Sequence, residues 1–136
     1  MKELVARKEI EVRFSEVDSM GIVWHGAYLK YLEDGREAFG KLFHLGYMEM
    51  YAHGYYVPLV ELDLQYKRPL NYPQTIFVDT RYIPCDAAKI KFEYFIYDIN
   101  NMIVSKANST QVFLDKEYNL ILNSPDFYLK WKEKYL

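Results

Sequence analysis

The chain has 136 residues, of which 51% are hydrophobic and 18% aromatic. This length suits a single domain over residues 1–136 and is sufficient for a sizeable core. Its 17 lysines and arginines stand against 19 aspartates and glutamates, so the charge balance argues against a nucleic-acid-binding or anionic-membrane-binding protein. An anionic ligand would therefore need a local basic patch.

The metal-ligating and targeting signals in the sequence are few. Cys85 is the only cysteine, which excludes an intrachain disulfide and a multi-cysteine zinc site. His44 and His53 have no carboxylate or cysteine at metal-ligand spacing, so we interpret both as structural or surface residues and expect no metal site. The N-terminus lacks the apolar core of a signal peptide, and no apolar run is long enough to cross a bilayer. We expect a cytoplasmic protein.

The first two elements are predicted from hydrophobic periodicity. Residues Lys8 to Ser15 alternate apolar and polar side chains, which predicts a strand with Ile10, Val12 and Phe14 on one face. A polar connection follows. From Ala27 to about Phe43 the apolar residues recur at helical spacing, which predicts one amphipathic helix of four to five turns.

Small residues indicate how this helix packs. Gly35 lies inside the helix, where glycine costs on the order of 1 kcal/mol relative to alanine, so we expect a close approach to a sheet. The last long strand has a face of small residues that would let a helix lie close over it: Ser105, Ala107 and Ser109. Gly46 is the expected helix stop, and a short connector with a helical turn is expected over residues 47–54.

Four further strands are predicted at residues 60–66, 75–83, 89–99 and 102–114. Asn100-Asn101 suits a hairpin turn, since asparagine tolerates positive φ. Ser124-Pro125-Asp126 predicts a C-terminal helix through about Tyr135, with serine as its cap and proline at its first position. The order of elements indicates an α+β fold with one helix against one antiparallel sheet. The other sheet face and the edges need cover, which a second copy would supply economically.

One stretch, from Val12 to Glu33 and continued by Arg36, carries a family resemblance. It resembles the pattern of the hotdog-fold thioesterases, in particular the 4-hydroxybenzoyl-CoA thioesterase-like group. That pattern is a strand, an acidic turn, an aspartate, a small residue, any residue, a glycine, two apolar residues, an aromatic residue and a histidine, then a helix with Tyr-Leu and Glu-x-x-Arg. Residues 66–70 resemble the end of the family's second strand. Val17, where many relatives carry threonine, and Ala27, where an asparagine often stands, depart from the pattern.

The resemblance implies a hotdog fold, with one long helix packed against a curved antiparallel sheet and a short C-terminal helix. It also implies an acyl-CoA thioesterase, in which Asp18 attacks the thioester carbonyl directly or activates water. The backbone N–H of His25, at the start of the helix, is the expected donor to the resulting oxyanion. Its imidazole, with a reference pKa of about 6.5, could orient water or protonate the departing thiolate. Coenzyme A is part of the substrate, so we expect no cofactor.

Other polar and aromatic residues receive secondary roles. Coenzyme A needs cations for its phosphates, and the candidates are Lys67, Arg68, Arg81, Lys89 and Lys91. Glu33 and Arg36 are three apart on the helix, so we interpret them as an ion pair. Tyr28 and Tyr31 are interpreted as core residues.

Several alternatives stay open at this point. The substrate could be an acyl-carrier-protein thioester, or the protein could be a non-catalytic module that senses acyl-CoA, although the carboxylate of Asp18 favours catalysis. A hydratase of the same fold ranks last, because that reading calls for a histidine about five residues after an aspartate, and His25 follows Asp18 by seven. We expect a homodimer or a dimer of dimers with the site at the subunit interface. The identity of the acyl group stays open.

Overall fold

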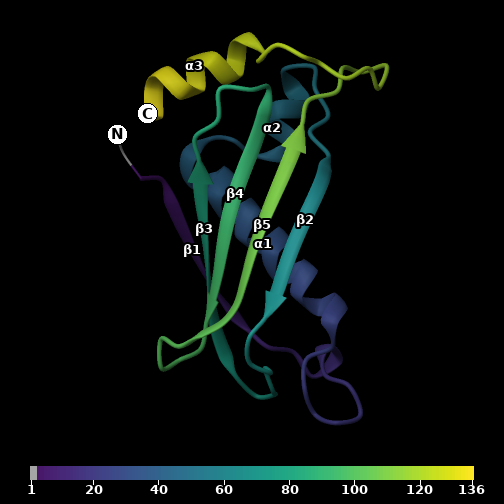
Figure 1. Ribbon diagram of the computed structural model, residues 1–136, viewed down its shortest axis with the longest axis vertical. Helices are drawn as coiled ribbons and strands as arrows, with labels where there is room; N and C mark the ends of the chain where they lie inside the picture. The colour runs from purple at the N-terminus through teal and green to yellow at the C-terminus, as the bar shows by residue number, and fades with distance from the viewer. Residues whose placement is uncertain (1–2) are drawn as a thin grey trace.

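The long helix and the sheet of the computed structural model form two layers, seen in Figure 1, and the structure describes residues 3–136. The elements in chain order are β1 (Val5–Glu11), a 3-10 turn η1 (Phe14–Glu16), α1 (His25–Phe43), α2 (Tyr47–Ala52), β2 (Leu59–Tyr66), β3 (Thr75–Ile83), β4 (Lys89–Tyr97), β5 (Ile103–Val112) and α3 (Asp126–Tyr135). The 5-stranded sheet is antiparallel with the order β1-β3-β4-β5-β2, so β1 and β2 are its edges. The predicted α+β plan is confirmed.

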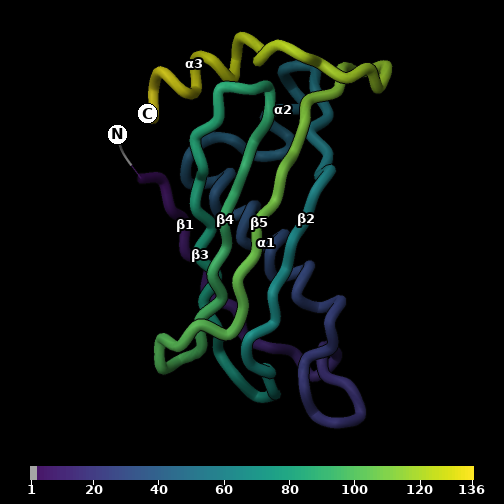
Figure 2. The backbone as a smooth tube through the Cα atoms, in the orientation of Figure 1, coloured from purple at the N-terminus to yellow at the C-terminus, as the bar shows by residue number. Residues whose placement is uncertain are grey.

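α1 crosses one face of the sheet diagonally, and α3 lies across one end, as the backbone tube in Figure 2 shows. The close approach predicted at Gly35 is confirmed, because a Cβ there would lie 2.4 Å from Thr80 Oγ1 and 3.0 Å from Val78 Cγ1. The strand that α1 approaches at this point is therefore β3, and not β5 with its small residues. No helix within residues 3–136 is long and apolar enough to span a membrane.

The core between the layers is rich in aromatic side chains. Its largest fully buried members include Tyr31, Tyr94, Tyr128, Phe39 and Phe113. Tyr94 exchanges a hydrogen bond of 2.5 Å with Ser109 and accepts another of 3.1 Å from Arg36 on α1. The predicted ion pair between Glu33 and Arg36 is wrong for residues 3–136, since the arginine reaches the sheet instead.

The first strand differs most from its prediction. It begins at Val5 and ends at Glu11, before the predicted end at Ser15. The chain leaves the sheet because residues 14–16 form a turn in which the Glu16 carboxylate accepts the Arg13 N–H at 2.8 Å. As a result Phe14, predicted to face the core, is 74% exposed.

The predicted caps of two helices differ from the structure, although α1 ends at Phe43 as predicted. The C-cap of α1 is a left-handed residue, His44, with φ 57°, and Gly46 caps the N-terminus of α2 instead of stopping α1. In α3 the N-cap is Pro125, and Ser124 makes no cap. The predicted Asn100-Asn101 turn is confirmed, with Asn101 at φ 62°. His53, interpreted as structural or surface, stacks on Phe127 with ring centroids 4.7 Å apart.

Candidate active site

The start of α1 presents a backbone N–H without a partner. Trp24 is the N-cap and His25 the first helical residue. The carbonyl of Trp24 accepts the Ala27 N–H at 3.1 Å, which fixes the peptide between Trp24 and His25. Since C=O and N–H point in opposite directions across a trans peptide, the His25 N–H points out of the helix start. Within residues 3–136 it has no hydrogen-bond acceptor, so it is a free donor at the positive end of the helix dipole.

A tight loop before the helix holds Asp18. The Asp18 N–H donates to the carbonyl of Ile22 at 2.8 Å, and its own carbonyl accepts the Gly21 N–H at 2.9 Å. Gly21 has φ +77°, a conformation that favours glycine. Oδ1 of the half-buried Asp18 side chain accepts the Met20 N–H at 2.8 Å. The other oxygen accepts no hydrogen bond within the described part of the chain and is available to react.

The two ends of this loop run antiparallel. Val17 pairs with Val23, and the carbonyl of Glu16 accepts the Trp24 N–H at 3.1 Å. Asp18 therefore stands about three residue steps, roughly 10 Å of extended chain, from His25. The structure brings both predicted catalytic residues to one junction between loop and helix.

A groove with a volume of about 230 Å³ adjoins His25. It is lined by Ile22, Val23, His25, Tyr28, Tyr66, Lys67, Arg68 and Pro69. The ring of Tyr66 meets the imidazole edge to face, with centroids 4.9 Å apart, and the Tyr66 hydroxyl donates to the His25 carbonyl at 3.3 Å. Two of the predicted phosphate-binding residues, Lys67 and Arg68, thus lie beside His25. Asp18 does not line this groove.

The other three basic candidates lie at the far end of the sheet, where β3 ends and β4 begins (Figure 1). Arg81 donates to Glu3 at 2.6 Å and is also paired with Glu93, and these hydrogen bonds raise the pKa of its guanidinium. Lys89 and Lys91 lie at the start of β4. The backbone carbonyl of Lys89 accepts a hydrogen bond from the Tyr128 hydroxyl at 3.1 Å. The structure does not bring these three residues to the start of α1.

Sequence reasoning missed Glu16, which is only 7% exposed. Its Oε1 accepts the Arg13 N–H at 2.8 Å and the Tyr31 hydroxyl at 2.9 Å. Burial, together with this carboxylate, raises the pKa of Tyr31. The only sequence signal was an acidic residue close before Asp18, because the partner Tyr31 lies on another element. Tyr31 and Tyr28 are both buried, as predicted.

Sequence reasoning also missed the contact between Trp24 and Gly26. The indole lies against the glycine so closely that a Cβ at Gly26 would come within 2.0 Å of the ring. A glycine two residues after an aromatic residue at a helix start was the available signal. The absent side chain of Gly26 leaves room for the indole at the start of α1.

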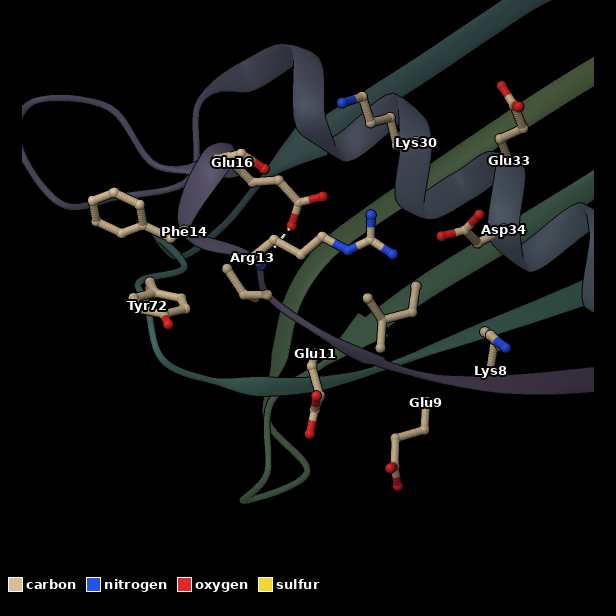
Figure 3. Close-up of a pocket in the computed structure, with 13 residues that line it drawn as sticks. Lys8, Glu9, Glu11, Arg13, Phe14, Glu16, Lys30, Glu33, Asp34 and Tyr72 are labelled. Atoms are coloured by element: carbon tan, nitrogen blue, oxygen red, sulfur yellow. Dashed lines mark hydrogen bonds between the residues drawn. The ribbon is translucent and has the colours of Figure 1, made fainter.

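A larger groove, of about 950 Å³, runs between β1 and α1 with Glu16 and Arg13 at one end (Figure 3). Its cations are Lys8, Arg13 and Lys30, and its carboxylates are Glu9, Glu11, Glu16, Glu33 and Asp34. Carboxylates outnumber cations, so this groove does not suit the phosphates of coenzyme A. Within residues 3–136 no three His, Cys, Asp or Glu side chains gather as metal ligands.

Comparison with known proteins relates the chain to thioesterases. Residues 12–131 match the model of the Thioesterase-like superfamily. Over 113 residues the chain is 39% identical to a Bacillus subtilis (strain 168) protein with the provisional name acyl-CoA thioesterase YneP, covering 83% of this chain and 82% of that protein. It is 29% identical over 111 residues to the chloroplastic acyl-acyl carrier protein thioesterase ATL3 of Arabidopsis thaliana, covering 81% of this chain and 58% of that protein.

The fold is similar to that of the DHNA-CoA thioesterase from Staphylococcus aureus, with a TM-score of 0.86. The two chains are 24% identical, and the alignment covers 96% of this chain and 88% of the other. The predicted hotdog architecture is confirmed by this likeness.

Proposed function

Because the chain belongs to the Thioesterase-like superfamily, its activity is thioester hydrolysis, and we propose that it hydrolyses acyl-CoA to a free acid and coenzyme A at the start of α1. The observation that carries this proposal is the unpaired N–H of His25, which points out of the helix beside the loop that holds Asp18. Such a donor is available for a negative charge that develops on a carbonyl oxygen.

In the proposed reaction the free oxygen of Asp18 attacks the thioester carbon, or takes a proton from a water that attacks it. The carbonyl oxygen becomes an oxyanion and accepts the His25 N–H. When the C–S bond breaks, the electron pair leaves on sulfur, and a protonated His25 imidazole gives the thiolate a proton, which the imidazole regains from the water consumed in hydrolysis. In the nucleophilic route, water then hydrolyses the anhydride formed on Asp18.

The coenzyme A moiety is assigned to the groove beside His25. Lys67 and Arg68 line this groove and supply two cations for its phosphates. Arg81, Lys89 and Lys91 remain candidates of second rank, because they lie at the opposite end of the sheet.

A second copy of the chain is proposed to pair along β2. Both sheet edges are open, but β1 carries Arg7, Lys8, Glu9 and Glu11, charges of the kind that prevent edge pairing. β2 instead begins with the exposed apolar residues Leu59 and Val60. Its last residue, Tyr66, contacts His25, so an interface along β2 reaches the site. This edge supports the proposed dimer or dimer of dimers.

The proposal is tested with purified protein and short-chain, long-chain and aromatic acyl-CoAs, by following release of the free thiol. Asp18→Asn is expected to lower kcat by about 10²–10⁴-fold, the range typical of a positioned acid–base group, with circular dichroism unchanged. Asp98→Asn is the matched control, because Asp98 also accepts backbone N–H groups in a turn, at 2.9 Å, and lies outside the site. Unchanged turnover in folded Asp18→Asn would contradict the proposed mechanism.

A carrier-protein thioesterase is the second candidate, supported by the similarity to ATL3. It predicts that an acyl-carrier-protein thioester has a higher kcat/KM than the coenzyme A ester of the same acyl group. Tight acyl-CoA binding without thiol release would instead identify a sensing module.

A further inference from the structure

Glu16 is the one charged side chain buried within residues 3–136. A buried carboxylate is costly unless hydrogen bonds replace its hydration. Here both bonds are made by one oxygen, which accepts the Arg13 N–H at 2.8 Å and the Tyr31 hydroxyl at 2.9 Å. Retaining a charge at such a position calls for a role beyond packing.

The position of Glu16 connects the two halves of the proposed site. Its side chain reaches Tyr31 on α1, the helix that begins at His25. Its backbone carbonyl accepts the N–H of Trp24, the residue directly before His25, at 3.1 Å. Glu16 also lies two residues before Asp18, at the end of the 3-10 turn η1. One residue therefore ties the loop with the carboxylate to the helix with the N–H donor.

We propose that Glu16 and Tyr31 are positioning residues, which form a clamp that sets the separation between the Asp18 carboxylate and the His25 N–H. The inference rests on the proposed function of that site. Neither residue is assigned to bond making, because both side chains are buried. Asp18, in contrast, is half-buried.

The clamp matters because thioester attack depends on alignment. A displacement of about 1 Å at a reacting group can cost on the order of 10²-fold in rate. Tyr31 lies in the same rigid helix as His25, so a shift of the helix at Tyr31 moves the His25 N–H as well. The burial that raises the pKa of Tyr31 keeps its hydroxyl protonated, and hence a donor, well into the alkaline range.

The test compares Tyr31→Phe, which removes only the hydroxyl, with Glu16→Gln, which keeps an acceptor oxygen but no charge, and Glu16→Leu, which keeps neither. We expect Tyr31→Phe and Glu16→Leu to lower kcat by roughly 10–100-fold with KM within about twofold, equally for every acyl-CoA that the protein hydrolyses. Glu16→Gln should restore most of the activity. The double variant Glu16→Leu/Tyr31→Phe should be no slower than Glu16→Leu, because each change alone already breaks the hydrogen bond between Tyr31 and Glu16.

Tyr47→Phe is the matched control, because Tyr47 is 56% exposed and its hydroxyl makes no hydrogen bond in the described chain. Wild-type turnover and its loss in Asp18→Asn are measured first, so absence of thiol release from the wild type refutes the proposed function and not the clamp alone. With those two results in place, wild-type kcat in folded Tyr31→Phe overturns the clamp.

The pH profile of kcat/KM provides the second criterion. A positioning role lowers the profile of Glu16→Gln slightly without changing its shape. Loss of the acidic limb in Glu16→Gln would show that Glu16 itself titrates in the reaction, which overturns the inference. If Tyr31→Phe does not fold, the activity and the profile of Glu16→Gln decide the question.

Discussion

At the scale of single residues, His25 offers two groups that can be separated by mutation. The imidazole contacts Tyr66, whereas the backbone N–H points out of α1 without a partner. His25 is the first helical residue, the position at which proline is best tolerated in a helix. Trp24 before it has φ −77° and ψ 157°, the extended conformation that a following proline requires.

His25→Pro is therefore expected to remove the N–H donor while leaving α1 folded. His25→Ala, its control, removes only the imidazole and should lower kcat by no more than about 10²-fold. His25→Pro should lower kcat by about a further 10²–10³-fold, because the oxyanion loses its donor. Steady-state kinetics on both variants, with helix content checked by circular dichroism, measures the difference. Equal rates in the two variants would remove the N–H from the mechanism.

Asp115 gives a pH-dependent contribution to stability. Its carboxylate accepts the N–H groups of Asn119 and Glu117, each at 2.9 Å, and these bonds hold its pKa below the usual value. A lowered folded-state pKa stabilises the protein above the unfolded-state pKa, which is about 3.9, and the contribution disappears as pH falls through the folded value.

The melting temperature of Asp115→Asn should accordingly lie below that of the wild type at pH 6–7, and the gap should narrow as the pH falls below about 3.9. Asp86→Asn, at an exposed aspartate with no side-chain hydrogen bond in the described chain, should show no comparable gap. Thermal melts over a pH series measure both. A gap that widens in acid would contradict the sign of the effect.

At the scale of elements, the distance of α1 from the sheet is set at Gly35. A methyl group there would meet Thr80 Oγ1 and Val78, so substitution forces the helix or the strand to move. Thr80 Oγ1 is itself buried and has no hydrogen-bond partner in the described structure, so removing it by mutation breaks no hydrogen bond.

Gly35→Ala is expected to destabilise the protein by about 1–2 kcal/mol. Overpacking typically costs about 1–3 kcal/mol, and the better helix propensity of alanine returns up to about 1 kcal/mol. In a Thr80→Ala background the nearest atom is gone, so the same glycine change should cost less or become stabilising. Urea unfolding of the four proteins gives the coupling. If the free-energy changes of Gly35→Ala and Thr80→Ala are additive, Thr80 is not the residue that an alanine at position 35 meets.

The sequence predicted elements well where periodicity and burial agreed. Strand β3 has its predicted limits, and α1 begins only two residues before its predicted start. The first strand was misplaced because Val12 continues the apolar alternation beyond the sheet, while the carboxylate of Glu16 turns the chain. Periodicity reports which residues are apolar, and it does not report a side-chain hydrogen bond that ends a strand.

The sequence predicted the reacting residues of the site, but it did not predict the contacts that hold them in position. Asp18 and His25 fall in a loop and at a helix start, as their polar and helical surroundings indicated. The bond from Tyr31 to Glu16 and the contact of Tyr66 with His25 join residues on different elements. Such pairs depend on tertiary packing, which hydrophobic periodicity does not encode. The same limit applies to Lys67 and Arg68, whose separation from Arg81 became clear only in the folded chain.

At the scale of the whole molecule, the two edges of the sheet have different character. β1 carries Arg7, Lys8, Glu9 and Glu11, whereas β2 carries the acidic residues Glu61 and Asp63 but begins with the exposed apolar residues Leu59 and Val60. An open apolar edge is a template for pairing with another chain, so β2 is the edge through which self-association is expected.

Val60→Lys is expected to convert the assembly to monomers, because Val60 is 53% exposed in the isolated chain and a lysine there opposes edge pairing. Leu129→Lys, at a residue of α3 that is 46% exposed, makes the same chemical change away from the edge and should leave the mass unchanged. Sedimentation velocity distinguishes the two. A wild-type monomer, or an unchanged mass in Val60→Lys, would contradict pairing along β2.

The hydrogen bond from Tyr66 to the His25 carbonyl places the last residue of β2 against the first residue of the catalytic helix. If β2 is the edge that a second chain covers, association and activity share a physical connection. The specific activity then obeys mass action: it falls when the enzyme is diluted below the dissociation constant of its own assembly, and a bound substrate restores it by favouring the associated form. Protein concentration thereby becomes a regulator of hydrolysis that requires no separate effector site.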